Sequence, residues 1–199
     1  CAFKDPKTIK INVTGALGKG VYAKDVILAI IQRLGVNGAT DRVLEFDGPV
    51  IRSFTMDSRM TLSNMAVEAG ATTGIIYPDA VTVDYLWPFI QKDYASKEAA
   101  VADFKQWWPD QDAVYEDVIT LDAGSLVPMM TFGYKPDQVK PVRELEGTPV
   151  DQVYIGSCTN GRIEDLRIVA QILKGKKIAD SVRVVLSPAT PKIFQQALS

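Results

Sequence analysis

Residues 153–166 read VYIGSCTNGRIEDL, and their order predicts a strand, a tight loop and a helix. The apolar run that forms the strand ends at Gly156, and an amphipathic segment begins at Ile163. Cys158 lies in the loop between them. The N-terminus of a helix carries the positive end of the helix dipole, which favours a thiolate there. Because the thiolate binds metals and attacks electrophiles, this loop is the candidate reactive site.

Strands and helices alternate on both sides of this stretch, which predicts parallel β-α-β units. The expected strands cover residues 8–13, 43–46, 51–54, 74–78, 118–121, 152–156 and 182–186. The expected helices cover 23–34, 58–69, a segment after Asp79 that Pro88 interrupts or divides, 97–107, 163–173 and a segment from Pro191. Ser58, Asp79 and Ser96 are the expected N-caps, and Gly35 and Gly70 the expected stops. The fold class is therefore α/β, with parallel or mixed sheets and helices packed on their faces.

The domain organisation follows from a change in composition. Residues 1–124 are predicted to form an α/β domain, and residues 151–199 the start of a second one. Residues 125–150 are rich in glycine and proline and weakly periodic, so we expect a connecting segment. The chain begins at Cys1 without a methionine, and its last helix has no stop signal, so we expect a piece of a longer protein truncated at both ends.

Charge and cysteine content exclude several classes of protein. The chain has 22 Lys and Arg against 24 Asp and Glu, a net charge of -2, which gives no electrostatic drive toward nucleic acid. No apolar run approaches the roughly 18 residues that span a bilayer, and the N-terminus lacks the layout of a signal peptide. Cys1 and Cys158 are the two cysteines, which make no disulfide framework and suit the reducing cytoplasm.

The sequence contains no histidine, which excludes Ser-His-Asp and Cys-His catalysis within these residues. It also excludes the usual zinc sites that contain histidine. A general base must therefore be a carboxylate, a lysine, a tyrosine or a group supplied from outside.

Asn64 and Glu68 are the second candidate pair, because residues four apart share one face of a helix. The alternative is that they form the solvated edge of an amphipathic helix. Cys158 also has an alternative, since a cysteine in such a place can be a small buried apolar residue, a nucleophile, a sensor or a metal ligand. Glu164 and Asp165 suit the N-terminus of a helix and read as an ordinary charged first turn.

Residues 156–167, GSCTNGRIEDLR, resemble the first cluster-cysteine motif of the aconitase superfamily, most closely its isopropylmalate-dehydratase and homoaconitase branch. Residues 20–28, 60–78 and 131–139 resemble the same family in the same order. The resemblance implies an aconitase-like fold. In it, residues 1–124 hold the end of one domain and a second domain, and residues 151–199 begin the domain that carries the cluster cysteine.

The resemblance also implies a hydro-lyase with a [4Fe-4S] cluster, whose open iron binds the substrate hydroxyl and carboxylate. The expected reaction is the isomerisation of 2-isopropylmalate and 3-isopropylmalate by dehydration and rehydration in leucine biosynthesis. A homoaconitase or aconitase-type dehydratase is the first alternative. A non-enzymatic α/β module in which Cys158 is a redox-sensing thiol is the second. RNA binding of the aconitase type is disfavoured by the charge balance.

By the same resemblance, Cys158 is the first of three cluster ligands and Asn160 a cofactor-binding residue, while Asn64 and Glu68 are catalytic. Cys1 matches no ligand position. The family's other two ligands form a Cys-x-x-Cys pair further downstream, its catalytic histidines lie upstream, and a small subunit carries the swivelling domain. The expected partners are thus that subunit and a small dicarboxylic or tricarboxylic hydroxy acid, with no nucleic acid and no membrane. We expect neither a cluster nor dehydratase activity from these 199 residues alone.

Overall fold

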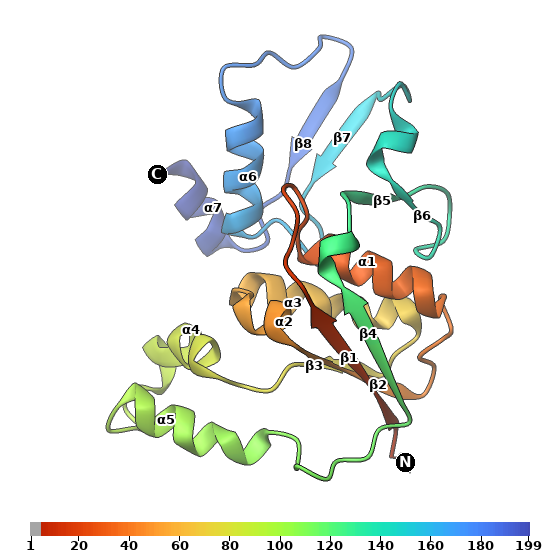
Figure 1. Ribbon diagram of the computed structural model, residues 1–199. Coiled ribbons are helices and arrows are strands. Elements are labelled where there is room, and N and C mark those ends of the chain that lie inside the picture. The colour runs from red at the N-terminus through yellow and green to blue at the C-terminus, as the bar shows by residue number, and fades with distance from the viewer. Residues whose placement is uncertain (1–4) are drawn as a thin grey trace, which may run out of the picture. The chain divides into compact units, whose positions relative to one another are not determined.

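The computed structural model describes residues 5–199 and divides the chain into two compact units, one ending at Val142 and one beginning at Arg143. Each unit is an α/β assembly with its own sheet (Figure 1). Cys1, for which the sequence predicts no ligand role, lies outside the described residues.

The first unit is built on a parallel four-stranded sheet. Its strands are β1 (Lys7–Thr14), β2 (Arg42–Asp47), β3 (Thr73–Ile75) and β4 (Asp117–Asp122). Their order is β3-β2-β1-β4, and every pairing in the sheet is parallel. Ile11 of β1 lies between Phe46 and Ile119, so apolar side chains of three neighbouring strands share one face. The α/β class predicted from the alternating pattern is confirmed.

That face of the sheet packs against α1 (Ala23–Leu34) and α3 (Met56–Met65). Helix α1 forms because apolar residues recur at helical spacing, and it ends at Gly35 as predicted. Apart from Ile51 and Val83, the largest fully buried side chains come from the sheet and these two helices: Phe46, Ile11, Ile27, Ile30, Ile31, Leu44, Leu62, Val13 and Val26. The core of the first unit therefore lies between the sheet and α1 and α3, which lie near each other in Figure 1.

The segment between β2 and α3 corrects one strand prediction. Residues 51–54 were expected to be a strand, but Pro49–Ser53 form the short helix α2. Pro49 occupies the first turn, where its missing N–H costs nothing, and Gly48 precedes it with φ of 110°. Val50 and Ile51 are both buried, and a short apolar run that is buried throughout does not distinguish strand from helix.

The boundaries of α3 also differ from the prediction. Thr55, rather than Ser58, is the N-cap, and its hydroxyl accepts a hydrogen bond from the amide of Ser58 at 3.3 Å. After Met65 the helix tightens into the 3-10 turn η1 (Ala66–Ala69), and the predicted stop at Gly70 is confirmed by its left-handed conformation. The following strand is shorter than predicted and not buried, since Ile75 is 47% exposed.

Two further helices project from the sheet before the chain returns to form β4: α4 (Ala80–Ile90) and α5 (Lys97–Phe104), followed by the 3-10 turn η2 (Lys105–Trp107). The predicted N-caps Asp79 and Ser96 are confirmed. The predicted interruption at Pro88 is wrong, because α4 continues through it. Pro88 lies exposed in the last turn, where a proline removes only one helical hydrogen bond.

Residues 123–145 are more ordered than their composition predicts. They contain the 3-10 turns η3 (Ala123–Ser125) and η4 (Val142–Leu145) and an antiparallel pair, β5 (Met129–Thr131) with β6 (Val139–Pro141). Buried Asp25 fixes β5 to the start of α1, because its carboxylate accepts hydrogen bonds from the amides of Met129 at 2.6 Å and Tyr22 at 2.7 Å. The domain limits predicted at 124 and 151 stay a prediction.

The second unit follows the predicted pattern. It contains β7 (Gln152–Ile155), α6 (Ile163–Leu173), β8 (Arg183–Leu186) and α7 (Pro191–Leu198), and its two strands pair in parallel. This is one β-α-β crossover, which confirms the strand, loop and helix read from the sequence. Within residues 5–199, no helix combines the length and the apolar character that crossing a membrane requires.

Candidate functional site

The loop that carries Cys158 joins the carboxyl end of β7 to α6, the position where open parallel sheets bind ligands. Cys158 is exposed, and its Sγ lies 3.8 Å from the hydroxyl of Thr159. Thr159 itself is only 6% exposed. The amide of Ser157 donates to the carbonyl of Asn160 at 3.2 Å, which closes these four residues into a small ring. The loop therefore presents the thiol outward and buries the next side chain.

The segment that follows β8 lies directly against this loop. The amide of Ala189 donates to the carbonyl of Gly161 at 2.9 Å. Gly156 and Gly161 have φ of 106° and 90°, and a Cβ at these positions would lie 2.0 Å and 2.7 Å from the carbonyl oxygen of Ser187. Both positions therefore require glycine, for conformation and for space. The glycines on either side of Cys158 allow the loop to pass close to the backbone after β8.

The Asn160 side chain is held by hydrogen bonds to Asp165. Its side-chain amide donates to both carboxylate oxygens of Asp165, at 3.2 Å and 3.3 Å. From the sequence, Asp165 is expected to be an ordinary charge in a first helical turn, and its contact with Asn160 is not predicted. An acidic residue at the third helical position is the signal that could have found it, because such residues often turn back to cap the preceding loop.

Asn64 and Glu68 lie in the first unit, whereas Cys158 and Asn160 lie in the second. Asn64 is exposed in the last turn of α3, and Glu68 is exposed in η1. The change from α-helix to 3-10 helix falls between them, so the regular four-residue spacing on one helical face does not extend through the pair.

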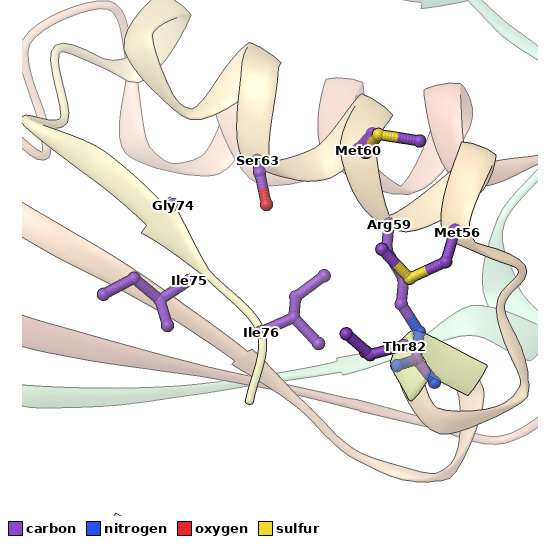
Figure 2. A pocket seen from close by; sticks show the side chains of 8 residues that line it. All are labelled: Met56, Arg59, Met60, Ser63, Gly74, Ile75, Ile76 and Thr82. Atoms are coloured by element: carbon purple, nitrogen blue, oxygen red, sulfur yellow. The ribbon is translucent and has the colours of Figure 1, made fainter. Parts of the chain in front are cut away.

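A pocket of about 260 Å³ opens beside α3, between that helix and the segment from β3 to α4 (Figure 2). Its walls are mostly apolar: Met56, Arg59, Met60, Ser63, Gly74, Ile75, Ile76 and Thr82 line it. Figure 2 shows the Ser63 hydroxyl directed into the space and the two isoleucines on the opposite wall. Neither Asn64 nor Glu68 lines the pocket, so it is separate from the predicted catalytic pair.

Arg59 is the charged group beside this pocket, and it is 3% exposed. Its guanidinium donates to both oxygens of Asp79 at 2.7 Å, and to the carbonyls of Phe54 and Arg52 at 3.1 Å and 3.0 Å. Burial alone would raise the pKa of Asp79, but the hydrogen bonds and the charge of Arg59 outweigh it and hold that pKa below its ordinary value. The pair joins α2, α3 and the N-cap of α4, which is a structural role.

A second titratable cluster lies around Asp47, the last residue of β2. Asp47 accepts from the hydroxyl of Tyr77 at 2.7 Å and pairs with Lys10 at 3.1 Å. Burial, followed by the hydrogen bond to Asp47, raises the pKa of Tyr77 to about 12. Arg52 also donates to the Tyr77 hydroxyl, at 2.9 Å. Each carboxylate and phenol in this cluster is satisfied by a neighbour, so we assign the cluster to the stability of the sheet.

The second unit is a β-α-β crossover with an exposed cysteine in the loop after its first strand, and comparison with known proteins identifies the family of this α/β chain. The model of the aconitase family (aconitate hydratase) matches residues 1–148 and 140–199. The chain belongs to the aconitase family.

Comparison with individual proteins shows which members of the family the chain is similar to. The chain is 69% identical to the 3-isopropylmalate dehydratase large subunit of Geotalea uraniireducens and 68% identical to that of Geobacter sulfurreducens, in each case over 100% of this chain and 46% of the relative. It is 41% identical to 3-isopropylmalate dehydratase large subunit 1 of Methanopyrus kandleri, over 98% of this chain and 44% of the relative. The chain thus spans about half the length of the curated relatives it matches.

The family implies an iron–sulfur cluster, and this chain can provide one cysteine ligand to it. Cys158 is an exposed thiol on a loop held from two sides, and cysteine thiolates are the usual ligands of such clusters. Within residues 5–199, no three His, Cys, Asp or Glu side chains gather closely enough to hold a metal ion. The sequence has two cysteines, so a complete set of three thiolates needs residues outside this chain.

Proposed function

We propose that this sequence forms part of the large subunit of an iron–sulfur hydro-lyase that interconverts 2-isopropylmalate and 3-isopropylmalate in leucine biosynthesis. The observation that carries the proposal is the identity of 69% over the whole chain to a large subunit of that name, together with the ordered cysteine loop. The proposal includes a small-subunit partner, a hydroxy-acid substrate and a cytoplasmic location, the last supported by the sparse use of cysteine.

In this proposal the Cys158 thiolate would hold the cluster, and Asn160 in the same loop would be a second cofactor-binding residue. When bound, a [4Fe-4S] cluster would supply Lewis-acid chemistry toward the substrate hydroxyl. The Glu68 carboxylate accepts and returns a proton at its oxygens, and a carboxylate is one of the bases available in a sequence without histidine. The Asn64 amide orients the hydroxyl or carboxylate by a hydrogen bond.

The test uses the full-length large subunit that contains this sequence, expressed with its small subunit and purified without oxygen. We expect Cys158→Ser to abolish the air-sensitive iron–sulfur absorption. The matched control is Cys1→Ser, which changes the other cysteine of these 199 residues and is expected to keep the absorption. Full absorption in the Cys158→Ser protein would refute the ligand assignment and favour the alternative of a redox-sensing thiol.

A further inference from the structure

The geometry points to Asp165 as the positioning residue for Cys158, and this inference rests on the proposed function of Cys158 as a cluster ligand. Asp165 occupies the third position of α6, and its side chain turns back toward the loop. Its Oδ2 accepts hydrogen bonds from the amides of Gly161 at 2.9 Å and Arg162 at 3.0 Å. With the two contacts from the Asn160 amide, one carboxylate holds three consecutive residues of the loop.

The fixed part of the loop determines where the thiol lies. Asn160 closes the small ring with Ser157, and Cys158 and Thr159 are the two residues inside that ring. On its other side the loop is held by the backbone bond from Ala189 to Gly161. Asp165 therefore acts on Cys158 through Asn160 and Gly161, without touching the thiol.

The contacts of Asp165 go beyond those of a helix cap, and they suit a residue that orients a metal ligand. A capping box needs one bond from the third helical side chain to the N-cap amide, and Asp165 makes it with Arg162, the N-cap of α6. Gly161 precedes the N-cap, so its bond to Asp165 holds the loop. The additional contact with the Asn160 side chain does nothing for the helix, but it fixes a residue two positions from Cys158. Residues outside the ligand shell that orient a ligand are a general requirement of metal sites, because they keep the donor atom where the metal binds.

The first experiment measures loop order in this 199-residue chain, with Cys1→Ser introduced so that Cys158 is the single thiol. We expect Asp165→Ala to increase the amide exchange rates of Gly161 and Arg162 by about tenfold or more, because a charge-assisted hydrogen bond is lost at each. The rate of Cys158 alkylation by iodoacetamide should change by at least about threefold. Asp165→Asn, which keeps the shape and one acceptor oxygen, should show a smaller effect of the same sign.

The matched control is Asp180→Asn, which removes an exposed carboxylate of the same unit that pairs with Lys177 at 2.9 Å. It should leave the Gly161 amide and the Cys158 rate unchanged. The amides of β8 report whether the unit stays folded. If Asp165→Ala also exposes β8, the comparison is made with Asp165→Asn alone. Unchanged exchange at Gly161 and unchanged alkylation of Cys158 in a folded Asp165 variant would overturn the inference.

The second experiment separates this inference from the proposed function. In the anaerobically purified large subunit, we expect Asp165→Asn to load a cluster whose absorption decays in air at least about threefold faster than in the parent protein. Decay at the parent rate would overturn the positioning role while leaving the ligand assignment intact. Cluster absorption that survives Cys158→Ser would instead overturn the proposed function, whatever the exchange rates at Gly161.

Discussion

Gly156 shows how far the Cys158 loop depends on single residues. Its φ of 106° is unfavourable for any residue with a side chain, and an added Cβ would meet the Ser187 carbonyl at 2.0 Å. Gly175 shares the positive φ, at 72°, but has open space around it. The two glycines therefore separate conformational strain from crowding within one unit.

We predict that Gly156→Ala destabilises the second unit by about 2–4 kcal/mol, because it adds a collision to the strain of about 1–3 kcal/mol that a positive φ costs. Gly175→Ala should cost about 1 kcal/mol. Urea unfolding followed by a probe in residues 143–199 measures both variants. Equal losses of stability in the two variants would mean that the close contact with the Ser187 carbonyl does not contribute to the cost of Gly156→Ala.

Glu68 is the residue at which the proposed chemistry can be tested with the fold unchanged. The side chain is exposed in η1, so its replacement should cost little stability. In the full-length enzyme we expect Glu68→Gln to lower kcat by about 10²–10⁴-fold, the usual loss when a general base is removed. Iron–sulfur absorption should be unaffected. Glu98→Gln, at an exposed position in the first turn of α5, is the control and should keep the parent kcat.

At the scale of elements, the pair of Arg59 and Asp79 decides how α3 and α4 are joined. Arg59 is almost fully buried, while the Asp79 side chain is 23% exposed. Removing one partner of a buried pair leaves the other charge without compensation. We expect Arg59→Met to destabilise the first unit by about 2–3 kcal/mol, at the low end for such pairs because solvent reaches Asp79.

The same pair predicts how stability depends on pH. The pKa of Asp79 in the folded chain is lowered from its ordinary value of 3.8, so its carboxylate stabilises the fold above that pH. This contribution is lost as the pH falls through the lower, folded pKa. Asp79→Asn keeps the N-cap of α4 but removes the charge, so its unfolding free energy should vary less between pH 5 and pH 2 than that of the parent. Asp84→Asn, in an exposed pair with Lys97, should follow the parent curve, and parallel curves for Asp79→Asn and the parent would contradict the prediction.

The elements that the sequence predicts well have both a periodic face and a definite end. Helix α1 has apolar residues at helical spacing and Gly35 behind it, and α6 follows the loop glycines. Helix α2 has no periodic face, because five residues are too few to show a period and both Val50 and Ile51 are buried. The hairpin of β5 and β6 depends on the distant carboxylate of Asp25, which no local pattern reveals.

The candidate site likewise has a part that local sequence predicts and a part that it does not. The position of Cys158 after a strand follows from local sequence, because the strand, the glycines and the helix are consecutive. The role of Asp165 depends on its side chain turning back to Asn160, and a first-turn acid is equally well explained by the helix dipole. The buried contacts of Arg59 reach across twenty residues to Asp79 and required the fold.

At the scale of the whole molecule, the two units differ in the size of their cores. The first unit has a large cluster of buried apolar side chains that its sheet and helices share. Within residues 143–199, all of which the structure describes, Leu166 is the one apolar side chain that is buried. A unit that buries so little apolar surface has little hydrophobic stabilisation of its own.

We therefore predict that residues 143–199 open at lower free energy than residues 5–142. Hydrogen exchange followed by mass spectrometry should show peptides of β7 and β8 exchanging at least about tenfold faster than peptides of β1 and β2. In the full-length large subunit the difference should shrink, if further residues complete the core of this unit. Equal protection of the two units in the 199-residue chain would contradict the prediction.

The position of β1 between β2 and β4 has a consequence for synthesis of the chain on the ribosome. The partner on one side, β2, ends at Asp47, whereas β4 ends at Asp122. Translation of the 108 residues from Thr14 to Asp122 takes roughly 5–20 s at usual rates. During that interval one edge of an apolar strand has no partner from its own chain. The nascent protein is then most exposed to pairing with a neighbouring polypeptide, and this is when a chaperone would be of most use to it.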